Sequence, residues 1–424
     1  MAIGGKSGRT PADLPRDPAM QQAPPPKHYP PKGLPITETG NVGYRVVLWG
    51  IAGVVAVLAA GSAAWILSLP PNPPAKAAPM VPQQESEAAL AALKPPKRQR
   101  PLVAIIGIND ATETTDYLMP YGILRRADVA DVMTLATEPG PVTLYPALKV
   151  EPNTTVADFD AQHPTGADYV IVPAMSRDDD PKVMAWLKAQ AEKGAIIIAV
   201  CAGAKVAAAA GLLDGHLGTT HWYFLNELRK EHPSIRYVAD RRFIVHGPRV
   251  TTTGITASMP MMLTLVEAIA GRSRAEALAK DIGLVSWDAR HDSDAFKLTR
   301  PFATTVLRNL FSFWQWEKLG IELTPGVDEV SLALSADAWS RTYRSRAYTF
   351  AGAPDALESR NGIRILPDEV ADSWPAESRI PPINERPPAQ ALDQTLRSIE
   401  SRYGRRTGAI VAMQLEYPRK PVER

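Results

Sequence analysis

The sequence predicts an α/β protein with a parallel sheet flanked by helices. One transmembrane helix is expected before this domain and a degenerate partial repeat after it. Three observations predict this organisation. Strand-like and helix-like runs alternate between residues 101 and 272, which is typical of a parallel sheet covered on both faces. The buried strand expected at 195–200 runs through a turn of small residues into a helix, which is the pattern of a nucleophile elbow. An uncharged apolar run covers residues 46–69.

The first hundred residues divide into three segments by composition. The chain has 40 prolines in 424 residues, and they concentrate in 11–35 and 70–96. Such stretches without hydrophobic periodicity predict a disordered proline-rich tail over 1–43 and an extended Pro/Ala-rich linker over 70–100. Between them, a transmembrane helix is expected over 44–69, because the apolar run is long enough to cross about 30 Å of hydrocarbon.

Charged residues around the apolar run predict its orientation. Lys27, Lys32 and Arg45 precede it, whereas Lys76 alone follows closely. The positive-inside rule then places the N-terminus in the cytoplasm and the main domain on the opposite, periplasmic or extracellular, side. A cleaved signal peptide is not expected, because more than forty residues precede the run.

Within the main domain, over 101–272, hydrophobic pattern and helix boundaries predict each element in turn. The expected order is strand 102–108, helix 116–126, strand 131–136, strand 167–173, helix 181–193, strand 195–200, helix 205–210, and the apolar helix 261–270. In such a sheet the carboxyl ends of the strands, where the segment 201–204 lies, form the ligand-binding edge.

Cys201 is the only cysteine, and it lies directly between the strand 195–200 and the following helix. A helix N-terminus favours thiolate over thiol, so the sequence predicts a pKa below the free value of about 8.5 and a nucleophilic role. The backbone N–H groups of Cys201 and Ala202 are then expected to hold an oxyanion. The alternative is a buried cysteine that acts as a small hydrophobic residue.

His221 is the candidate base, because the path from the elbow through 211–220 can return it to the cysteine. There it could accept the thiol proton or hold the thiolate as an ion pair. Taken alone, the residue is equally consistent with a hydrogen-bonded structural histidine.

The run AVCAGAKVAAAAGLLDGHLGTTHW, residues 199–222, resembles the ThiJ/PfpI superfamily, the class I glutamine-amidotransferase-like fold. It is similar to the amidase-like domain that other proteins fuse to an AraC-type DNA-binding module. The resemblance implies a flavodoxin-like domain with a cysteine, a histidine and an acid. Asp116 falls at the acid position, four residues before Pro120. One departure is Ala174, which stands where the family places glycines beside the oxyanion hole.

After a connector over 273–316, the segment 317–424 reads as a partial repeat of the first third of the fold, followed by a helix over 389–402 and a strand-like stretch over 407–417. A shift of 215 residues aligns Arg126 with Arg341 and Asp116 with Ser331. The copy therefore lacks the acid and the cysteine, and we expect it to pack against the first domain or a partner subunit.

Two further segments carry weaker signals. The aromatic run 311–316 is bracketed by charges, so we expect it to pack between the domains rather than to form a second membrane span. His291 lies in an acidic stretch whose spacing matches no metal site, and we expect a solvated loop there.

Two functions remain open from the sequence. One is a cysteine-dependent hydrolase or amidase-like or aldehyde-handling enzyme, with Cys201, His221 and Asp116 as its catalytic residues. The other is a non-catalytic small-molecule or redox sensor that regulates a partner, in a role related to transcription. A net charge of +2 and the absence of a helix-turn-helix pattern after residue 272 predict no direct DNA binding. No cofactor or metal is expected, and the ligand and a homo-oligomeric state are left open.

Overall fold

The computed structural model describes residues 40–74, 76–383 and 386–418. The chain divides into two compact units, residues 1–61 and 62–424. The expected tail, 1–43, lies almost wholly outside the described residues. Among the residues described, one helix is long and apolar enough to cross a membrane. It is α1 (Gly40–Ser68), in which Val46–Ser68 has a mean hydropathy of 2.2.

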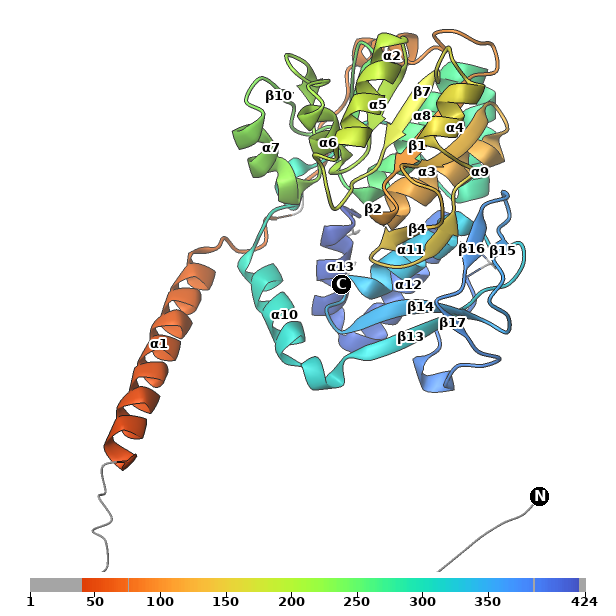
Figure 1. Cartoon of the computed structure of the whole chain (residues 1–424). Helices are drawn as coiled ribbons and strands as arrows, with labels where there is room; N and C mark the ends of the chain where they lie inside the picture. The colour runs from red at the N-terminus through yellow and green to blue at the C-terminus, as the bar shows by residue number, and fades with distance from the viewer. Residues whose placement is uncertain (1–39, 75, 384–385, 419–424) are drawn as a thin grey trace, which may run out of the picture. The chain divides into compact units, whose positions relative to one another are not determined.

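A seven-stranded sheet forms the centre of the second unit, in the order β11-β12-β8-β7-β1-β3-β6 (Figure 1). Its neighbouring strands are parallel except for the pair β11 and β12. The strands are β1 (Leu102–Gly107), β3 (Asp131–Ala136), β6 (Thr154–Thr155), β7 (Tyr169–Val172), β8 (Ile196–Ala199), β11 (Phe243–His246) and β12 (Arg249–Thr252). The predicted parallel α/β sheet is confirmed.

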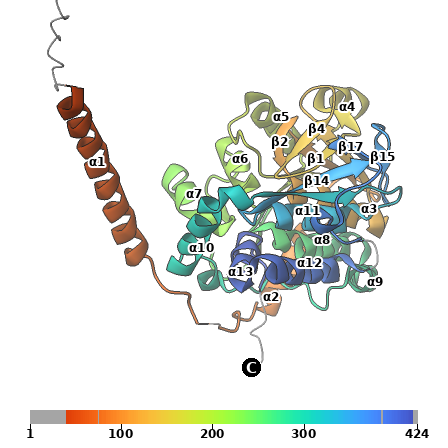
Figure 2. The same ribbon diagram turned by 90° about the horizontal axis from the view of Figure 1, so that it is seen from below.

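Helices cover both faces of this sheet, as Figure 2 shows from below. Alternate residues of β1 enter separate cores, because successive strand side chains point to opposite faces. Val103 and Ile105 pack with α3 (Thr114–Ala127) and with α8 (Ser258–Ala270) and α9 (Arg272–Ile282). Ala104 and Ile106 pack on the other face, which is covered by α4 (Val156–Gln162), α5 (Pro181–Glu192) and α6 (Gly203–Ala209).

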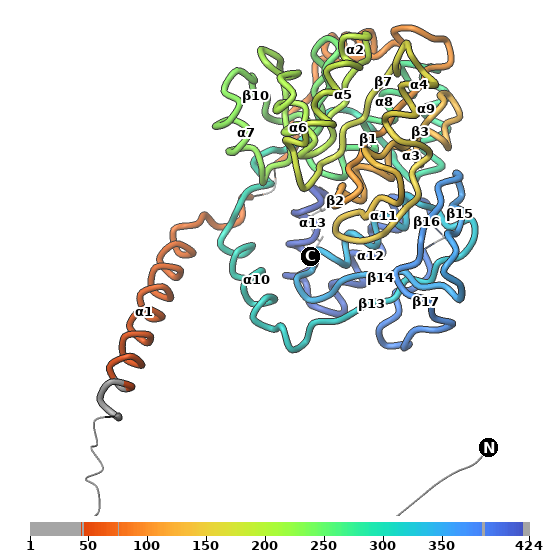
Figure 3. Tube along the Cα trace, viewed as in Figure 1, coloured from red at the N-terminus to blue at the C-terminus, as the bar shows by residue number. Residues whose placement is uncertain are grey.

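The C-terminal part builds a second, smaller parallel sheet in the order β13-β14-β17. Its elements are β13 (Glu317–Glu322), α11 (Glu329–Ser340), β14 (Ser345–Ala351), β17 (Glu369–Val370), α12 (Pro388–Tyr403) and α13 (Arg405–Gln414). The tube in Figure 3 shows α11 lying between this sheet and α3. The helix predicted at 389–402 is present as α12.

The strand predicted over 407–417 is wrong, because most of that stretch is the helix α13. The β-branched pair Ile410 and Val411 favours a strand locally. Tertiary packing overrides this preference, because both side chains are buried where α13 packs against α12 and α10 (Arg300–Phe311).

A third sheet joins the two halves in the order β15-β16-β5-β4-β2. Its strands are β2 (Asp110–Glu113), β4 (Val142–Tyr145), β5 (Lys149–Glu151), β15 (Leu357–Glu358) and β16 (Arg364–Leu366). The antiparallel pair β5 and β16 crosses from one half to the other. The second unit also contains the helix α7 (Leu225–Glu231) and the short strands β9 (Leu217–Gly218) and β10 (Arg236–Tyr237).

Three local expectations need correction. The linker 70–100 contains the helix α2 (Gln83–Ala92), since its run of Gln, Glu and Ala consists of helix formers. The aromatic run 311–316 does not pack between domains. It is exposed, with Trp314 at 70% of its accessible area, because α10 ends there at the surface. His291 is buried and stacked on Phe296 rather than solvated.

Candidate cysteine site beneath the C-terminal segment

Cys201 lies on a tight elbow between β8 and α6. Its backbone is left-handed, with φ of 56°, a conformation that strains a residue with a side chain. Two residues later the chain passes so close to β7 that a Cβ on Gly203 would lie 1.9 Å from the Val172 carbonyl oxygen. The glycine is therefore required by close packing, and the elbow predicted at the carboxyl end of the sheet is present.

The main chain of Cys201 is held by two threonine hydroxyls. Its N–H donates to Thr252 Oγ1 at 3.0 Å, and its carbonyl accepts a hydrogen bond from Thr220 Oγ1 at 3.0 Å. The first contact occupies one of the two N–H groups expected to hold an oxyanion. The other, that of Ala202, interacts with the Cys201 sulfur.

Asp116 lies at the start of α3 and is fully buried. Its Oδ2 accepts from the Ala174 N–H at 3.1 Å, while Oδ1 has no hydrogen-bond partner among the residues that the structure describes. Burial, and then the neighbouring Glu113 carboxylate, raise the pKa of Asp116 well above its usual range. The Ala174 amide, next to the expected oxyanion position, is thus engaged by the acid.

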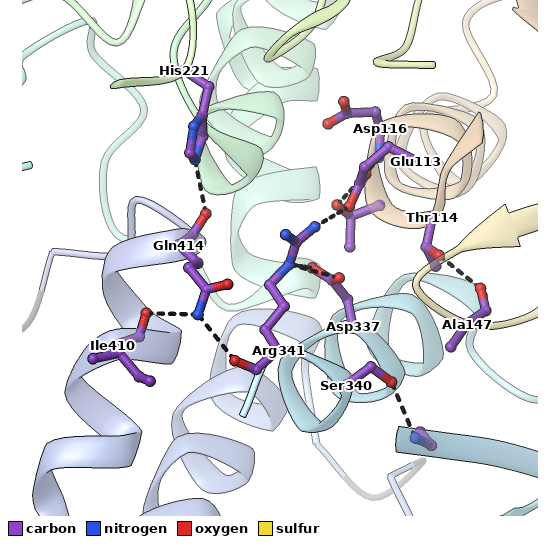
Figure 4. A network of polar contacts seen from close by, with 12 residues as sticks. Glu113, Thr114, Asp116, Ala147, His221, Asp337, Ser340, Arg341, Ile410 and Gln414 are labelled. Atoms are coloured by element: carbon purple, nitrogen blue, oxygen red, sulfur yellow. Dashed lines mark hydrogen bonds and ion pairs between the residues drawn. The ribbon is translucent and has the colours of Figure 1, made fainter. Parts of the chain in front are cut away.

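Arg341 reaches this region from α11's C-terminal end, as Figure 4 shows. Its guanidinium donates to Glu113 Oε1 at 2.8 Å and to Asp337 Oδ1 at 2.8 Å. Burial raises the pKa of Asp337 to about 7, more than Arg341 lowers it. Glu113 Oε2 in turn accepts from the Asp116 N–H at 2.6 Å. One arginine therefore faces a cluster of three buried carboxyl groups.

Both ring nitrogens of His221 are hydrogen-bonded to main-chain groups. Its Nε2 lies 2.9 Å from the carbonyl oxygen of Gln414, as Figure 4 shows. Its Nδ1 accepts from the Tyr223 N–H at 3.2 Å. These partners require the proton on Nε2. Burial lowers the pKa of the ring, which favours the neutral form. The hydrogen bonds of His221 thus run to main-chain groups, and its catalytic role stays a prediction.

Glu416 closes the site from the C-terminal side. Its Oε1 accepts from the Trp222 N–H at 2.7 Å, and its carbonyl accepts from Thr256 Oγ1 at 2.9 Å. A Cβ on Gly254 would lie 2.6 Å from the Glu416 Cβ, so the glycine after β12 makes room for this residue. Glu416 Oε2 lies 3.6 Å from His291 Nε2 and accepts no hydrogen bond.

The predicted depressed pKa of Cys201 is wrong. Burial raises the pKa of the thiol well above its ordinary value, and the carboxylates of Asp116, Glu113 and Glu416 add to the effect. The Ala202 N–H acts in the opposite direction but does not compensate. A helix N-terminus and a nearby histidine predict a lowered pKa, whereas the fold removes water from the sulfur and brings three acids near it.

Sequence reasoning missed most of the groups around the cysteine. Glu113 lies in a short strand before the expected helix, and Arg341, Gln414 and Glu416 follow Cys201 by more than a hundred residues. One signal was available. Arg341 aligns with Arg126 in the partial repeat, which marked it as a residue at a structurally equivalent position.

The fold and the elbow define a parallel α/β domain with a cysteine at the carboxyl edge of its central sheet. The sequence profile of the DJ-1/PfpI family matches residues 103–268. The chain is 30% identical over 166 residues to isonitrile hydratase of Pseudomonas putida, covering 38% of this chain and 69% of that enzyme. The chain belongs to the DJ-1/PfpI family.

Regulators are also among its relatives. The HTH-type transcriptional regulator CdhR of Pseudomonas aeruginosa is 28% identical over 125 residues, 30% of this chain and 37% of the regulator. This chain thus spans little more than a third of that relative. Among solved structures, a ThiJ/PfpI family protein from Pseudomonas syringae has a TM-score of 0.40 at 20% identity, covering 44% of this chain and 76% of the other.

Proposed function

We propose that this chain is a membrane-anchored sensor of the DJ-1/PfpI family, in which chemical modification of Cys201 changes the position of the C-terminal segment 405–417. The observation that carries the proposal is the cover over the site. Gln414 and Glu416 accept hydrogen bonds from His221 and from the residue after it, and Glu416 lies against Gly254. We expect a change at Cys201 to act on this segment through Glu416, whose charge influences the thiol.

Four features argue against turnover. Cys201 is 4% exposed, and its raised pKa leaves little thiolate near neutral pH, which slows nucleophilic attack and peroxide oxidation alike. Both nitrogens of His221 bond main-chain groups. The Cys201 N–H donates to Thr252. Ala174 stands where glycines would let an amide approach an oxyanion, and its N–H is bonded to Asp116.

Oxidation gives a concrete signal. A peroxide converts the thiol to a sulfenic acid and water, and a second equivalent gives the sulfinic acid and water. The sulfinate is an anion, and it would form beside Asp116, Glu113 and Glu416. Like charges at short range in a buried site repel one another strongly. Glu416 belongs to the C-terminal segment, so we expect that segment to move.

The second candidate is an enzyme, favoured by the elbow itself and by the identity to isonitrile hydratase. Cys201 is 4% exposed, so a substrate could reach it only after a neighbouring segment moves, and this proposal assigns that movement to the segment 405–417. In the enzyme, movement of the segment 405–417 would admit a substrate to Cys201. In the sensor, the same movement would change the surface that the protein presents to a partner.

Two measurements on the full chain in detergent separate these functions. Hydrogen–deuterium exchange before and after mild peroxide should rise over 405–417 in the wild type and stay unchanged in Cys201→Ser. Assays of isonitrile hydration and ester hydrolysis should give equal rates for both proteins. Turnover that Cys201→Ser abolishes would establish the enzyme instead, and unchanged exchange despite oxidised Cys201 would reject the sensor.

A further inference from the structure

Six elements of the C-terminal part recur at one constant spacing. Strands β13, β16 and β17 begin and end 215 residues after β1, β5 and β6. Helix α11 begins 215 residues after α3, and β14 and β15 follow β3 and β4 at the same spacing to within one residue at their start. The element order and strand order also agree, since β13-β14-β17 matches β1-β3-β6.

The copies share a side-chain contact as well. Asn153 Oδ1 accepts from the N–H and the hydroxyl of Thr134 at 2.8 and 3.0 Å. At the same spacing, Asp368 Oδ2 accepts from the N–H and the hydroxyl of Thr349 at 2.8 and 2.9 Å. Secondary structure alone does not require this pair, so it supports a common origin of the two segments.

The two copies meet through reciprocal contacts. Arg126 pairs with Asp328 at 2.6 Å, and Arg341 pairs with Glu113 at 2.8 Å. Exchanging each residue for its counterpart 215 positions away converts one ion pair into the other. In a two-fold interface, if one residue contacts a second, the counterparts make the same contact. These buried pairs therefore lie across a local two-fold axis.

The backbone follows the same symmetry. In the antiparallel pair of β5 and β16, Val150 lies opposite its own counterpart Ile365, and the flanking pairs exchange with each other. Helices α3 and α11 pack together so closely that a Cβ on Gly122 would lie 2.5 Å from Val330 Cγ2.

We infer that residues 317–370 are an internal second copy of residues 102–155, and that this copy completes the Cys201 site from within one chain by supplying Arg341. The copy covers the face of α3 and β5 on which a second molecule's equivalent segment would fit. The inference goes beyond the proposed sensor and holds equally for an enzyme.

Only one of the two equivalent ion pairs serves the site. Arg341 and Glu113 both interact electrostatically with Cys201. Arg126 and Asp328 lie instead near Asp281 and Arg360. In the second copy Ser331 replaces Asp116, and the chain has no second cysteine. Arg341 is thus a positioning residue, which offsets the carboxylates that raise the pKa of the thiol.

The mirror pair provides a matched control. Arg341→Gln and Arg126→Gln should both lower Tm, and Arg341→Gln by the larger amount, because Arg341 also pairs with the buried Asp337. Only Arg341→Gln should slow alkylation of Cys201 at pH 8, by about tenfold for a pKa rise of about one unit. Arg341→Lys, which keeps the charge, should restore most of the rate and serves where the glutamine variant does not fold. Equal alkylation profiles for both glutamine variants would overturn the assignment.

A separate observation concerns the surface at the end of α10. Leu310, Phe311, Phe313, Trp314 and Trp316, here called the aromatic patch, are 45–73% exposed. Isolated apolar residues on a surface are ordinary, but a contiguous aromatic group marks an interaction site. Tryptophan and phenylalanine are typical of surfaces that enter the lipid headgroup region.

The start of α10 is bonded to the residues that follow the apolar helix. The Arg300 guanidinium donates to the carbonyl oxygens of Leu67 and Leu69. The backbone N–H of Arg300 donates to the carbonyl oxygen of Pro70. Twelve residues of α-helix span about 18 Å. The aromatic patch therefore lies within about 25 Å of the point where the span would leave the bilayer.

We propose that the aromatic patch binds the lipid surface beside the span, which rests on the proposed membrane anchoring. The test uses the full chain in nanodiscs, in a Cys201→Ser background, with a fluorophore on Trp314→Cys or, as control, on the exposed position Val285→Cys. Nitroxide lipids should quench only the label at 314. Quenching of that label by aqueous iodide alone would overturn the proposal, and shielding from both quenchers would assign the patch to a protein partner. Failure of the chain to enter nanodiscs would reject the anchor itself.

Discussion

The imidazole Nε2 of His221 lies 2.9 Å from the carbonyl oxygen of Gln414, a residue 193 positions later in the chain. The contact joins the expected catalytic histidine to the last turn of α13. A ring that donates to this carbonyl and accepts from the Tyr223 N–H is locked in one tautomer. The imidazole of His221 therefore anchors the last turn of α13 through the Gln414 carbonyl.

Replacing His221 with alanine should change stability more than thiol chemistry. The Gln414 carbonyl and the Tyr223 N–H would lose their partner, which costs about 1–3 kcal/mol for buried groups. The pH dependence of Cys201 alkylation should stay close to that of the wild type or shift to lower pH as the cover loosens. A shift of the alkylation midpoint to higher pH would show that His221 stabilises the thiolate after all.

Glu416 should protect Cys201 from reagents. In Glu416→Gln, one of the three carboxylates that raise the thiol pKa is neutralised, so the alkylation midpoint should move to lower pH and the rate at pH 8 should rise severalfold. The matched control is Glu322→Gln, an exposed glutamate paired with Arg379, which should leave the rate unchanged. A rate for Glu416→Gln equal to that of the control would contradict the proposed cover.

The part of the fold that depends on local pattern could be predicted. Strands such as β1 and β8 are buried on both faces and are therefore continuous apolar runs, and Cys201 at the end of β8 follows from its position in the sequence. The acid Asp116 could be found through the family pattern. The charge of Asp116 raises the thiol pKa, and the catalytic role of the residue stays a prediction.

The electrostatics could not be predicted, because they depend on segments that are distant in sequence. The elbow alone indicates a reactive thiolate, whereas burial, and then the charges of Asp116, Glu113 and Glu416, raise the pKa of the thiol instead. Similarly, Ile410 and Val411 favour a strand locally, but they lie in the helix α13, where both side chains are buried against α12 and α10. The secondary-structure propensities of individual residues do not indicate which distant segment will pack over a site.

The buried carboxyl group of Asp337 should make stability depend on pH. Its folded pKa of about 7 lies above the unfolded value near 4, so between these limits the folded state binds the extra proton. The free energy of unfolding contributed by this group is then fully present below about pH 4 and falls as pH rises towards 7. Asp337→Asn should remove that slope. Chemical unfolding at pH 5 and pH 8 measures it, and an identical change in wild type and variant would contradict the assigned protonation.

The last prediction concerns the side of the membrane on which Cys201 lies. The candidate span Val46–Ser68 has a mean hydropathy of 2.2, and more lysine and arginine residues precede it than follow it closely. Cytoplasmic flanks carry the excess of positive charge, so the N-terminus should stay inside and residues after 70 should be exported. Alkaline phosphatase fused after residue 90 should be active, and a fusion of green fluorescent protein at the same position should be dark. Adding three lysines after Lys76 removes the charge bias and serves as the matched variant, in which a fraction of the chains should invert. A fluorescent fusion in the unmodified chain would place the domain in the cytoplasm.

In the exported orientation Cys201, as the single cysteine, has no partner within its chain for a disulfide. Its oxidation would then proceed to sulfenic and sulfinic acids or to a mixed disulfide, which mass spectrometry of the purified chain distinguishes.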